Sequence, residues 1–255
     1  MSKRRYPILE FDFKGEGKIK PSYVVDKYGV HDFPANVIIC FFKEVINDLF
    51  FKNKIEEYLT INGENSYHFF KYKDKDIAIV HGSVGAPACI GQVEEAIAFG
   101  AKRIMFCGGA GSLDKSITVG KVIVIDSAIR DEGVSYHYLK PGRQVNADSK
   151  IVNTIKKYLE DQKEDFVIGK TWTTDAFYRE TEEKIKRRKK EGAIIVEMEQ
   201  ASILAVAKFR KVKYGAIIYS GDDLSKERWD SRDWRHKVGV REKLVKYCED
   251  IVELI

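Results

Sequence analysis

Two glutamates flank a methionine where an apolar run meets an apolar helical pattern. Glu197, Met198 and Glu199 follow residues 194–196, and the helical pattern at 199–209 comes next. Carboxylates at such a junction are seldom buried without a partner. A carboxylate in a pocket can accept hydrogen bonds from two neighbouring hydroxyl groups, which suits a ribose. The stretch therefore predicts a sugar-binding carboxylate, although acidic residues also gather at helix N-termini to complement the dipole.

Two further polar stretches contain side chains suited to an aromatic ligand. Phe177 follows the polar residues 173–175, and its ring could stack on a base, although core packing explains it as well. Asp222 and Asp223 follow the apolar run 216–219. Because neighbouring like charges raise the pKa of one member, this pair is a candidate proton donor, and a solvated turn is the alternative.

Two glycine-containing stretches follow other apolar runs. Gly82, Ser83 and Gly85 stand between one run and a helical pattern, and Gly108 and Gly109 follow a second run. Glycine lets backbone N–H groups approach an anion or a sugar, and a helix N-terminus favours negative charge. Each stretch predicts a ligand-binding turn after a strand, and a purely structural turn is the alternative.

The elements that must position these side chains alternate along the chain. Short runs rich in Ile and Val, typical of strands buried on both faces, lie at 37–40, 77–80, 104–107, 122–125, 194–196 and 216–219. Helical patterns lie at 90–99, 148–160, 199–209 and 241–254, with Asp148 as an expected N-cap. The alternation predicts a single α/β domain at 34–255, a central mixed β-sheet flanked by helices, after an extended N-terminal arm at 1–33. In such sheets ligands bind outside the carboxyl ends of strands, so the polar stretches should meet there.

The composition argues against several other classes of protein. The 255 residues include 44 Lys plus Arg and 39 Asp plus Glu, a small and dispersed excess that does not indicate a nucleic-acid partner. We expect the basic run 184–190 to be a solvated helix, because no aromatic residues interleave it. No run approaches the ~18 apolar residues of a membrane span and no leader pattern opens the chain, so we expect a cytoplasmic protein. The four cysteines and five histidines show no metal-ligand spacing, and we expect reduced buried thiols and no metal or other cofactor.

The order of these stretches resembles the nucleoside phosphorylase family, which holds purine and uridine phosphorylases and the nucleosidases. The resemblance runs from about Val37 to the C-terminus, and residues 130–138 look closest to the uridine phosphorylases. It implies the family fold, a nucleoside substrate and a homo-oligomer, either a dimer or a hexamer.

The resemblance also implies roles for individual residues. Met198 would pack on the ribose, Glu199 would bind its 2′ and 3′ hydroxyls, Phe177 would lie against the base, and Asp222, with Asp223 as a near alternative, would protonate the departing base. Other positions where the resemblance implies substrate contacts are Glu197, Ser83, Gly108, Gly109 and His137.

The chain departs from the phosphorolytic members at their phosphate site. Those members generally carry Gly-Asp-Pro-x-x-Arg after the first strand, where this chain has Cys-Phe-Phe-Lys-Glu-Val at 40–45. Phe106 stands where they carry a further arginine, and Gly109 where they carry Ser or Thr. Arginine suits phosphate because its planar fork donates two hydrogen bonds. Lys43, Arg130 or an arginine from the N-terminus of a neighbouring subunit could substitute.

Three functions remain open at this point. The middle of the chain favours phosphorolysis of a nucleoside, with inorganic phosphate as co-substrate. Hydrolysis is the alternative, because Glu44 lies nearly in register with the glutamate that activates water in the nucleosidases. The third interpretation is a protein that binds a nucleoside without turnover, in which Phe41 and Phe42 close the site.

Overall fold

Strands alternate with helices along the chain, as the apolar runs predict. The computed structural model describes residues 6–12 and 15–255. The strands are β1 (Asn36–Cys40), β2 (Ile55–Ile61), β3 (Tyr67–Tyr72), β4 (Ile77–His81), β5 (Arg103–Ser112), β6 (Val122–Asp131), β7 (Gln144–Asn146), β8 (Phe166–Thr174), β9 (Ala193–Glu197) and β10 (Lys213–Asp223). The α-helices are α1 (Ser22–Tyr28), α2 (Lys43–Phe51), α3 (Ala86–Phe99), α4 (Ser149–Asp161), α5 (Glu182–Lys190), α6 (Gln200–Arg210) and α7 (Val238–Ile251). Short 3₁₀ helices are η1 (Pro7–Leu9), η2 (Val134–His137), η3 (Phe177–Arg179) and η4 (Trp234–His236).

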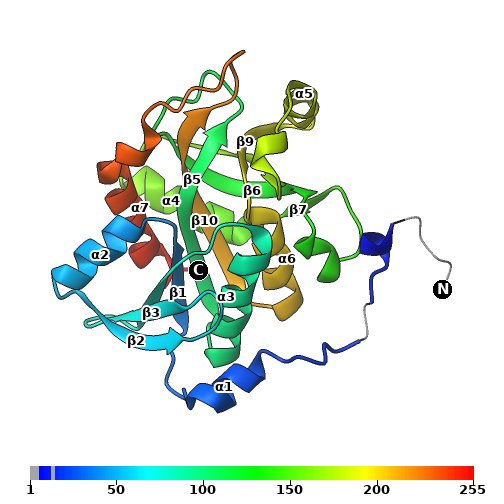
Figure 1. Cartoon of the computed structure of the whole chain (residues 1–255). Helices are drawn as coiled ribbons and strands as arrows, with labels where there is room; N and C mark the ends of the chain where they lie inside the picture. Colours follow the sequence, from blue (N-terminus) through cyan, green and yellow to red (C-terminus); the bar gives the residue numbers. More distant parts are fainter. Residues whose placement is uncertain (1–5, 13–14) are drawn as a thin grey trace.

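The strands form one mixed ten-stranded sheet, which confirms the predicted fold class (Figure 1). Its order is β10-β6-β8-β9-β5-β1-β4-β3-β2, with β7 on β6. Because β10 also pairs with β5, the five strands β5, β10, β6, β8 and β9 close into a ring, and β1, β4, β3 and β2 extend from it as a wing. The strands β4, β1, β5 and β10 run parallel, so their carboxyl ends share one edge. Within β5, only the last residues, Gly111 and Ser112, pair with β9. The carboxyl end of β9 therefore lies at the same edge of the sheet.

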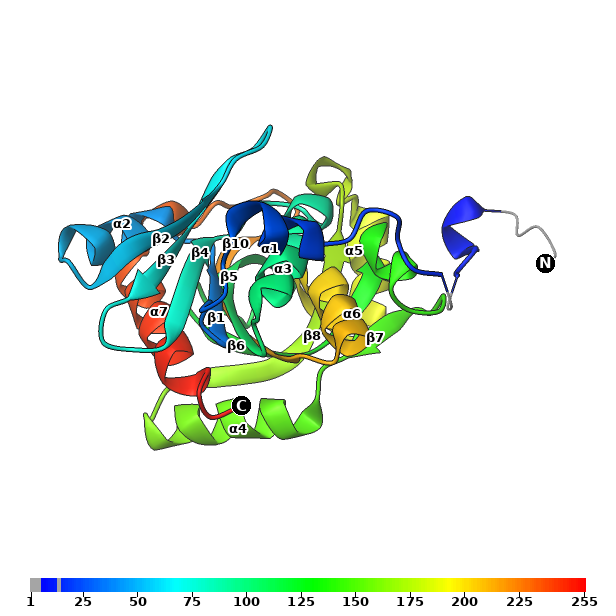
Figure 2. The ribbon, with the colours of Figure 1, turned by 90° about the horizontal axis from the view of Figure 1, so that it is seen from below.

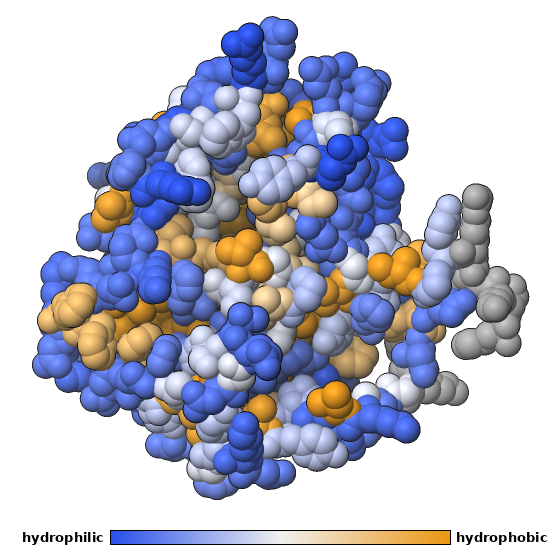
Figure 3. Space-filling view, viewed as in Figure 1, coloured by the Kyte–Doolittle hydropathy of each residue, from blue (hydrophilic) through white to orange (hydrophobic). Residues whose placement is uncertain are grey.

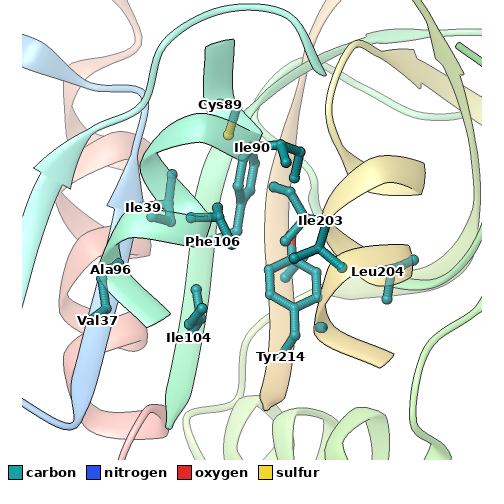
Figure 4. Close-up of a cluster of buried hydrophobic side chains, with 14 of the residues drawn as sticks. Val37, Ile39, Cys89, Ile90, Ala96, Ile104, Phe106, Ile203, Leu204 and Tyr214 are labelled. Carbon is teal, nitrogen blue, oxygen red and sulfur yellow. The ribbon is translucent and has the colours of Figure 1, made fainter. Parts of the chain in front are cut away.

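Two apolar layers hold the helices on the sheet. Along β1 the side chains of Val37 and Ile39 join the cluster under α3 and α6, while those of Ile38 and Cys40 join the cluster over α4 and α7. This alternation is the two-residue period of a strand that is buried on both faces. Figure 2 shows α4 and α7 on one side of the sheet and α3 and α6 on the other. In Figure 4, Phe106 of β5 points toward Cys89 and Ile90 of α3.

The second glycine stretch is part of β5 and not a turn after it, which corrects the prediction. Gly108 and Gly109 pair with residues of β10, and Gly111 pairs with Val196 of β9. The strand continues because neighbours on both sides keep its backbone hydrogen-bonded. The glycines are explained by close packing, since a Cβ at Gly108 would lie 2.8 Å from the Phe106 ring.

Several other elements differ from the predicted ones. The strands β2, β3, β7 and β8 and the helices α1 and α2 were not predicted, and α3 begins at Ala86, before the predicted start at residue 90. The arm predicted at 1–33 contains α1, which packs on α3; its residues 1–5 and 13–14 lie outside the described part. The predicted N-cap of α4 is confirmed, because the Asp148 carboxylate accepts a hydrogen bond from the Lys150 N–H at 2.8 Å. The basic run forms α5, a largely exposed helix as predicted, except that Arg188 is buried and pairs with Asp131. Within residues 6–12 and 15–255, no helix is long and apolar enough to cross a membrane.

Candidate functional site

The predicted polar stretches meet at the carboxyl ends of the parallel strands. The loop before α3, the end of β5, the β9–α6 turn and the end of β10 lie together there (Figure 1). Figure 3 shows that this face of the molecule is hollowed near its centre, close to the start of α3.

Glu199 joins the acidic stretch to the first glycine stretch. The residue is the N-cap of α6, and only 5% of its surface is exposed. Its Oε1 accepts a hydrogen bond from the Gly85 N–H at 2.6 Å. The half-buried Met198 stands beside it in the β9–α6 turn. One carboxylate therefore ties the loop before α3 to the start of α6 and keeps further acceptor capacity for a ligand.

Glu197 was predicted to contact substrate, but its acceptors are used within the protein. The Oγ1 atoms of Thr171 and Thr173 on β8 donate to its Oε1 at 3.1 and 2.5 Å. Its Oε2 accepts from the backbone N–H groups of Glu199 and Gln200, each at 2.6 Å. Four donors match the lone-pair capacity of one carboxylate, so Glu197 shapes the turn that presents Glu199. The threonines were missed because only the register of β8 against β9 reveals them.

The two glutamates form a buried pair with shifted titration. Burial raises the pKa of Glu199 above its usual value of 4.5, and the charge of Glu197 adds to the effect. Burial also raises the pKa of Glu197, against the hydrogen bonds that favour its charged form. Donors from a ligand would lower the cost of ionising Glu199, because hydrogen bonds to a carboxylate stabilise its charge. Carboxyl groups whose pKa is raised by burial, against hydrogen bonds that favour the charged form, are typical of binding and catalytic sites.

Trp229 and Glu180 both interact with Asp222 at the end of β10. The indole Nε1 of Trp229 donates to Asp222 Oδ2 at 2.6 Å. Burial and then the charge of Asp222 raise the pKa of Glu180, which follows η3, to about 7. Phe177 opens η3 with 49% of its surface exposed and contacts Tyr178 at a ring separation of 4.1 Å. This exposure excludes the core-packing interpretation of Phe177. Trp229 and Glu180 carried no motif and were missed in the sequence.

Asp223 is a structural residue, which removes it as the alternative proton donor. Its side chain is fully buried and forms an ion pair with Arg232. Burial opposes its ionisation, but hydrogen bonds from Ser225 and the charge of Arg232 hold the pKa of Asp223 below its usual value. An acid that stays ionised cannot donate a proton near neutral pH.

Aromatic rings cover the glycines beside this pocket. A Cβ at Gly82 would overlap the ring of Phe41, and a Cβ at Gly108 would meet the ring of Phe106. The two rings contact each other with centroids 5.0 Å apart and planes at 40°. The side of each glycine on which a Cβ would stand therefore faces apolar carbon, and these rings offer an anion no hydrogen bond. Phe42 does not share this surface: its side chain is buried in the opposite layer.

Of the basic side chains considered as substitutes, Arg130 is engaged elsewhere, Lys43 is exposed near His81, and the N-terminal arginines at 4 and 5 lie outside the described residues. Arg130 donates to the Ser135 hydroxyl and to the carbonyl oxygens of Lys140 and Leu139, so it holds the loop after η2. Lys43 is exposed, and its positive charge is one cause, after burial, of the lowered pKa of His81.

Glu44 is ion-paired with an arginine that sequence reasoning missed. Arg241 of α7 donates from Nη1 to Glu44 Oε1 at 2.5 Å and from Nε and Nη2 to the Tyr219 hydroxyl, each at 3.0 Å. The Tyr219 ring in turn lies 3.3 Å from the place of a Cβ at Gly109. Glu44 is thereby linked through Arg241 and Tyr219 to the end of β5.

Three predicted residues make no side-chain hydrogen-bond contact with Glu199 in the part of the chain that the structure describes. The Ser83 N–H donates to Gln92 Oε1 at 2.8 Å, which fixes the loop before α3 and leaves the hydroxyl half-buried. Gly109 is half-buried within β5. His137 is exposed at the end of η2, and no hydrogen bond joins it to Glu199 in the described chain. Over residues 6–12 and 15–255, no three His, Cys, Asp or Glu side chains gather as metal ligands would.

Solved structures share this fold. A uridine phosphorylase from Vibrio fischeri aligns with a TM-score of 0.73 and 22% identity over 89% of this chain and 95% of that one. An AMP nucleosidase from Bacteroides thetaiotaomicron aligns with a TM-score of 0.75 and 16% identity over 92% and 97%. At these identities the likeness concerns the fold.

Sequence comparison extends the likeness beyond the fold. A guanosine phosphorylase from Halorubrum lacusprofundi is 28% identical over 146 residues, which cover 57% of this chain and 61% of that relative. The chain thus spans about three fifths of that relative's length in the match. The family described as the phosphorylase superfamily matches residues 36–253. Since that match covers every strand of the sheet and every element of the pocket, the chain belongs to the phosphorylase superfamily.

Proposed function

We propose that this protein cleaves the N-glycosidic bond of a nucleoside and that water is the attacking nucleophile. The observation that carries the choice of water is the aromatic cover of Phe41 and Phe106 over Gly82 and Gly108. A phosphate ion needs cationic or N–H donors around it, and these rings supply none.

The sugar would be held by Glu199. Its buried carboxylate keeps acceptor capacity beyond the Gly85 N–H, and the 2′ and 3′ hydroxyls of a ribose supply two donors. As the bond to the base breaks, C1′ becomes positively charged, and a nearby carboxylate stabilises that charge more than the neutral ground state. Met198 would lie against the sugar from the same turn.

The departing base would be received at the other end by Asp222 and Phe177. The base leaves with negative charge, and a carboxylic acid that donates a proton removes that charge, with a typical gain of ~10²–10⁴-fold. Trp229 fixes one oxygen of Asp222, which leaves the other for the base. The exposed Phe177 ring offers a face for stacking.

Water would be activated by Glu44. Arg241 holds Oε1, and no hydrogen bond to Oε2 is recorded among residues 6–12 and 15–255, so Oε2 can accept a proton from water. The Arg241–Tyr219 contact orients this carboxylate relative to the end of β5. Arg241 itself is buried, with donors directed to Glu44, Tyr219 and the Trp234 carbonyl, which argues against its use as a phosphate ligand.

Phosphorolysis is the second candidate, and the names of the relatives favour it. The guanosine phosphorylase and the uridine phosphorylase that this chain resembles both use phosphate by name. For phosphorolysis here, an arginine would have to come from outside the pocket described above.

An assay with a nucleoside panel separates the candidates. The protein is incubated with purine and pyrimidine nucleosides, with and without inorganic phosphate, and the sugar product is identified by mass spectrometry. Free ribose at a rate independent of phosphate supports hydrolysis. Ribose 1-phosphate with an absolute need for phosphate supports phosphorolysis and overturns the proposal. Saturable nucleoside binding without turnover by calorimetry would instead indicate a binding protein.

A further inference from the structure

The indole of Trp229 reaches Asp222 from an exposed loop. Trp229 lies on the loop between β10 and η4 with 64% of its surface exposed, yet its Nε1–H finds a protein acceptor. It donates to Asp222 Oδ2 at 2.6 Å, across seven positions of the chain. Since ordering an exposed side chain on one acceptor costs conformational entropy, the contact points to a role for this bond at Asp222.

The stem of this loop is fixed on both sides of Trp229. Asp223 and Asp230 exchange backbone hydrogen bonds at 2.8 and 3.1 Å, which closes the loop like a short hairpin. Arg232 donates to the Asp223 carboxylate and, at 2.9 Å, to the Ile117 carbonyl. Arg232 also keeps a left-handed backbone with a φ of +48°, a conformation that persists at a non-glycine residue where neighbouring contacts fix it. The indole is therefore presented from a firmly held stem.

The two adjacent aspartates at the end of β10 receive different kinds of donor. Asp223 is paired with the cation of Arg232, which holds it ionised. Asp222 receives the neutral indole N–H, and no ion pair of Asp222 is recorded within residues 6–12 and 15–255. A neutral donor bonds both to the carbonyl oxygen of a carboxylic acid and to a carboxylate. The partner of Asp222 therefore suits a group that must change its protonation state.

The bond from Trp229 also decides which oxygen of Asp222 carries the proton. A carboxylic acid has its O–H on one oxygen, and the other oxygen is the better acceptor for a donor such as an indole. Because Oδ2 accepts from Trp229, the proton belongs on Oδ1. Oδ1 lies on the side of β5, 3.4 Å from the place of a Cβ at Gly111. The acidic O–H is thus turned toward the end of β5, which borders the pocket.

We propose that Trp229 is a positioning residue that holds Asp222 so that Oδ1 delivers the proton to N7, an acceptor, of a departing purine. As the C1′–N9 bond breaks, its electron pair passes to the base, the proton moves from Oδ1 to N7, and Asp222 is left as a carboxylate. Glu44 takes a proton from the attacking water, whose oxygen forms the new bond to C1′. The indole bond strengthens as its acceptor becomes charged, so it favours the transition state over the ground state. The inference rests on the proposed function, because it assigns the support of that same proton donor.

The kinetic test compares the purine nucleoside that the wild type cleaves fastest with its 7-methyl derivative. A methyl group on N7 gives the base a positive charge, so this base leaves as a neutral molecule without a proton from Asp222. Trp229→Phe keeps an aromatic ring and removes the N–H donor. For the unmodified nucleoside, kcat should fall by about 10-fold at a KM near the wild-type value, and for the 7-methyl derivative both constants should stay within about 2-fold of the wild type. Equal losses of kcat with the two substrates overturn the inference.

Two further variants separate this role from a general effect on the loop. Arg228→Gln changes the exposed neighbour of Trp229 on the same loop and should leave kcat and KM for both substrates at the wild-type values. Asp222→Asn should cost about 10²-fold in kcat with the unmodified nucleoside, and adding Trp229→Phe to it should cost less than about 2-fold more. The same substrate-dependent loss in Arg228→Gln, or a full additional loss in the double variant, would show that Trp229 does not act through Asp222 and overturns the inference.

Binding of free bases separates this inference from the proposed function. The tightest-bound of adenine, guanine and hypoxanthine is compared by calorimetry with its 7-deaza analogue, which has no acceptor at position 7. The wild type should bind the purine at least about 5-fold more tightly than the analogue, and Trp229→Phe should reduce that preference to about 2-fold or less. If no nucleoside is cleaved, the proposed function fails, and this pattern still supports the positioning of Asp222. Equal affinities for the two bases in the wild type, a preference unchanged in Trp229→Phe, no base binding, or cleavage of pyrimidine nucleosides alone overturns the inference.

Discussion

Glu199 Oε1 lies 2.6 Å from the backbone nitrogen of Gly85, a residue 114 positions earlier in the chain. The contact joins the loop before α3 to the start of α6, and it places a buried carboxylate beside the strand ends of β5 and β9. Glu197 fixes the turn that carries Glu199 by accepting four hydrogen bonds, so the acceptor that we propose for a sugar is positioned before any ligand arrives.

We expect Glu199→Gln to stabilise the protein at high pH. The pKa of Glu199 is raised in the folded state, first by burial and then by Glu197, so its stabilising contribution is complete below about pH 4.5 and is lost as the pH rises through the folded-state pKa. Glutamine removes this loss and its Oε1 can still accept from Gly85. The variant should gain roughly 1–3 kcal/mol over the wild type at pH 8 and almost nothing at pH 4.5. Urea denaturation at the two pH values measures the difference in unfolding free energy between the variant and the wild type. Equal gains at both pH values would contradict a raised pKa of Glu199 as the cause.

Thr173→Val should disturb the support of the pocket. Valine keeps the shape of the side chain but removes a donor to Glu197 and an acceptor for the Ala201 N–H, both buried. The free energy of unfolding should fall by about 1–3 kcal/mol, and nucleoside turnover should fall with it. Thr173→Ser retains the hydroxyl and is the matched control. If the serine and valine variants lose equal activity, the hydroxyl is not the reason for the effect.

Gly82→Ala tests the aromatic cover of the glycines. The added methyl group would overlap the Phe41 ring, so the ring must move at a cost of about 1–3 kcal/mol in unfolding free energy. Truncation in Phe41→Ala makes room, and the double variant should recover part of that cost. Gly91→Ala in α3 has no neighbouring atom near its added methyl group and should be neutral or stabilising by up to about 1 kcal/mol. Additive effects of Gly82→Ala and Phe41→Ala in chemical denaturation would show that the ring does not cover Gly82.

Glu44→Gln should slow the chemical step and leave substrate binding intact. Glutamine can still accept from Arg241 but cannot take a proton from water, so kcat should fall by about 10²-fold while KM stays near the wild-type value. Glu242→Gln, an exposed position next to Arg241 on α7, is the control. Steady-state kinetics with the best nucleoside gives both constants. An unchanged kcat would remove Glu44 from the mechanism.

The elements found from the sequence are those with an unambiguous local pattern. The continuous apolar runs of β1, β4 and β10 and the capped helix α4 were predicted because each is readable within ten or so residues. The wing strand β2 was missed because Ile55-Glu56-Glu57-Tyr58 alternates only in part and faces solvent on one side. The glycines at the end of β5 predict a turn because glycine is typical of turns, whereas in the structure they admit the Phe106 ring.

Site residues could be predicted where they stand together in one sequence motif. They could not be predicted where the fold brings together residues that are far apart in the sequence. Glu199 and Met198 stand in one motif, so their place at a strand–helix junction followed from the sequence. The partners of Glu197 come from β8, and Arg241 reaches Glu44 across 197 positions. Such contacts depend on strand register and helix packing, which no local pattern encodes.

The proposed contact between Glu199 and the paired hydroxyls of the sugar is tested most directly by varying both partners. The values of kcat/KM are measured for wild type and Glu199→Gln, each with adenosine and with 2′,3′-dideoxyadenosine. Loss of the carboxylate should cost about 100-fold or more with the ribonucleoside and little with the dideoxy compound, because the lost hydrogen bonds exist only with the first. Equal losses with both substrates would contradict the assignment of Glu199 as the ribose-binding carboxylate.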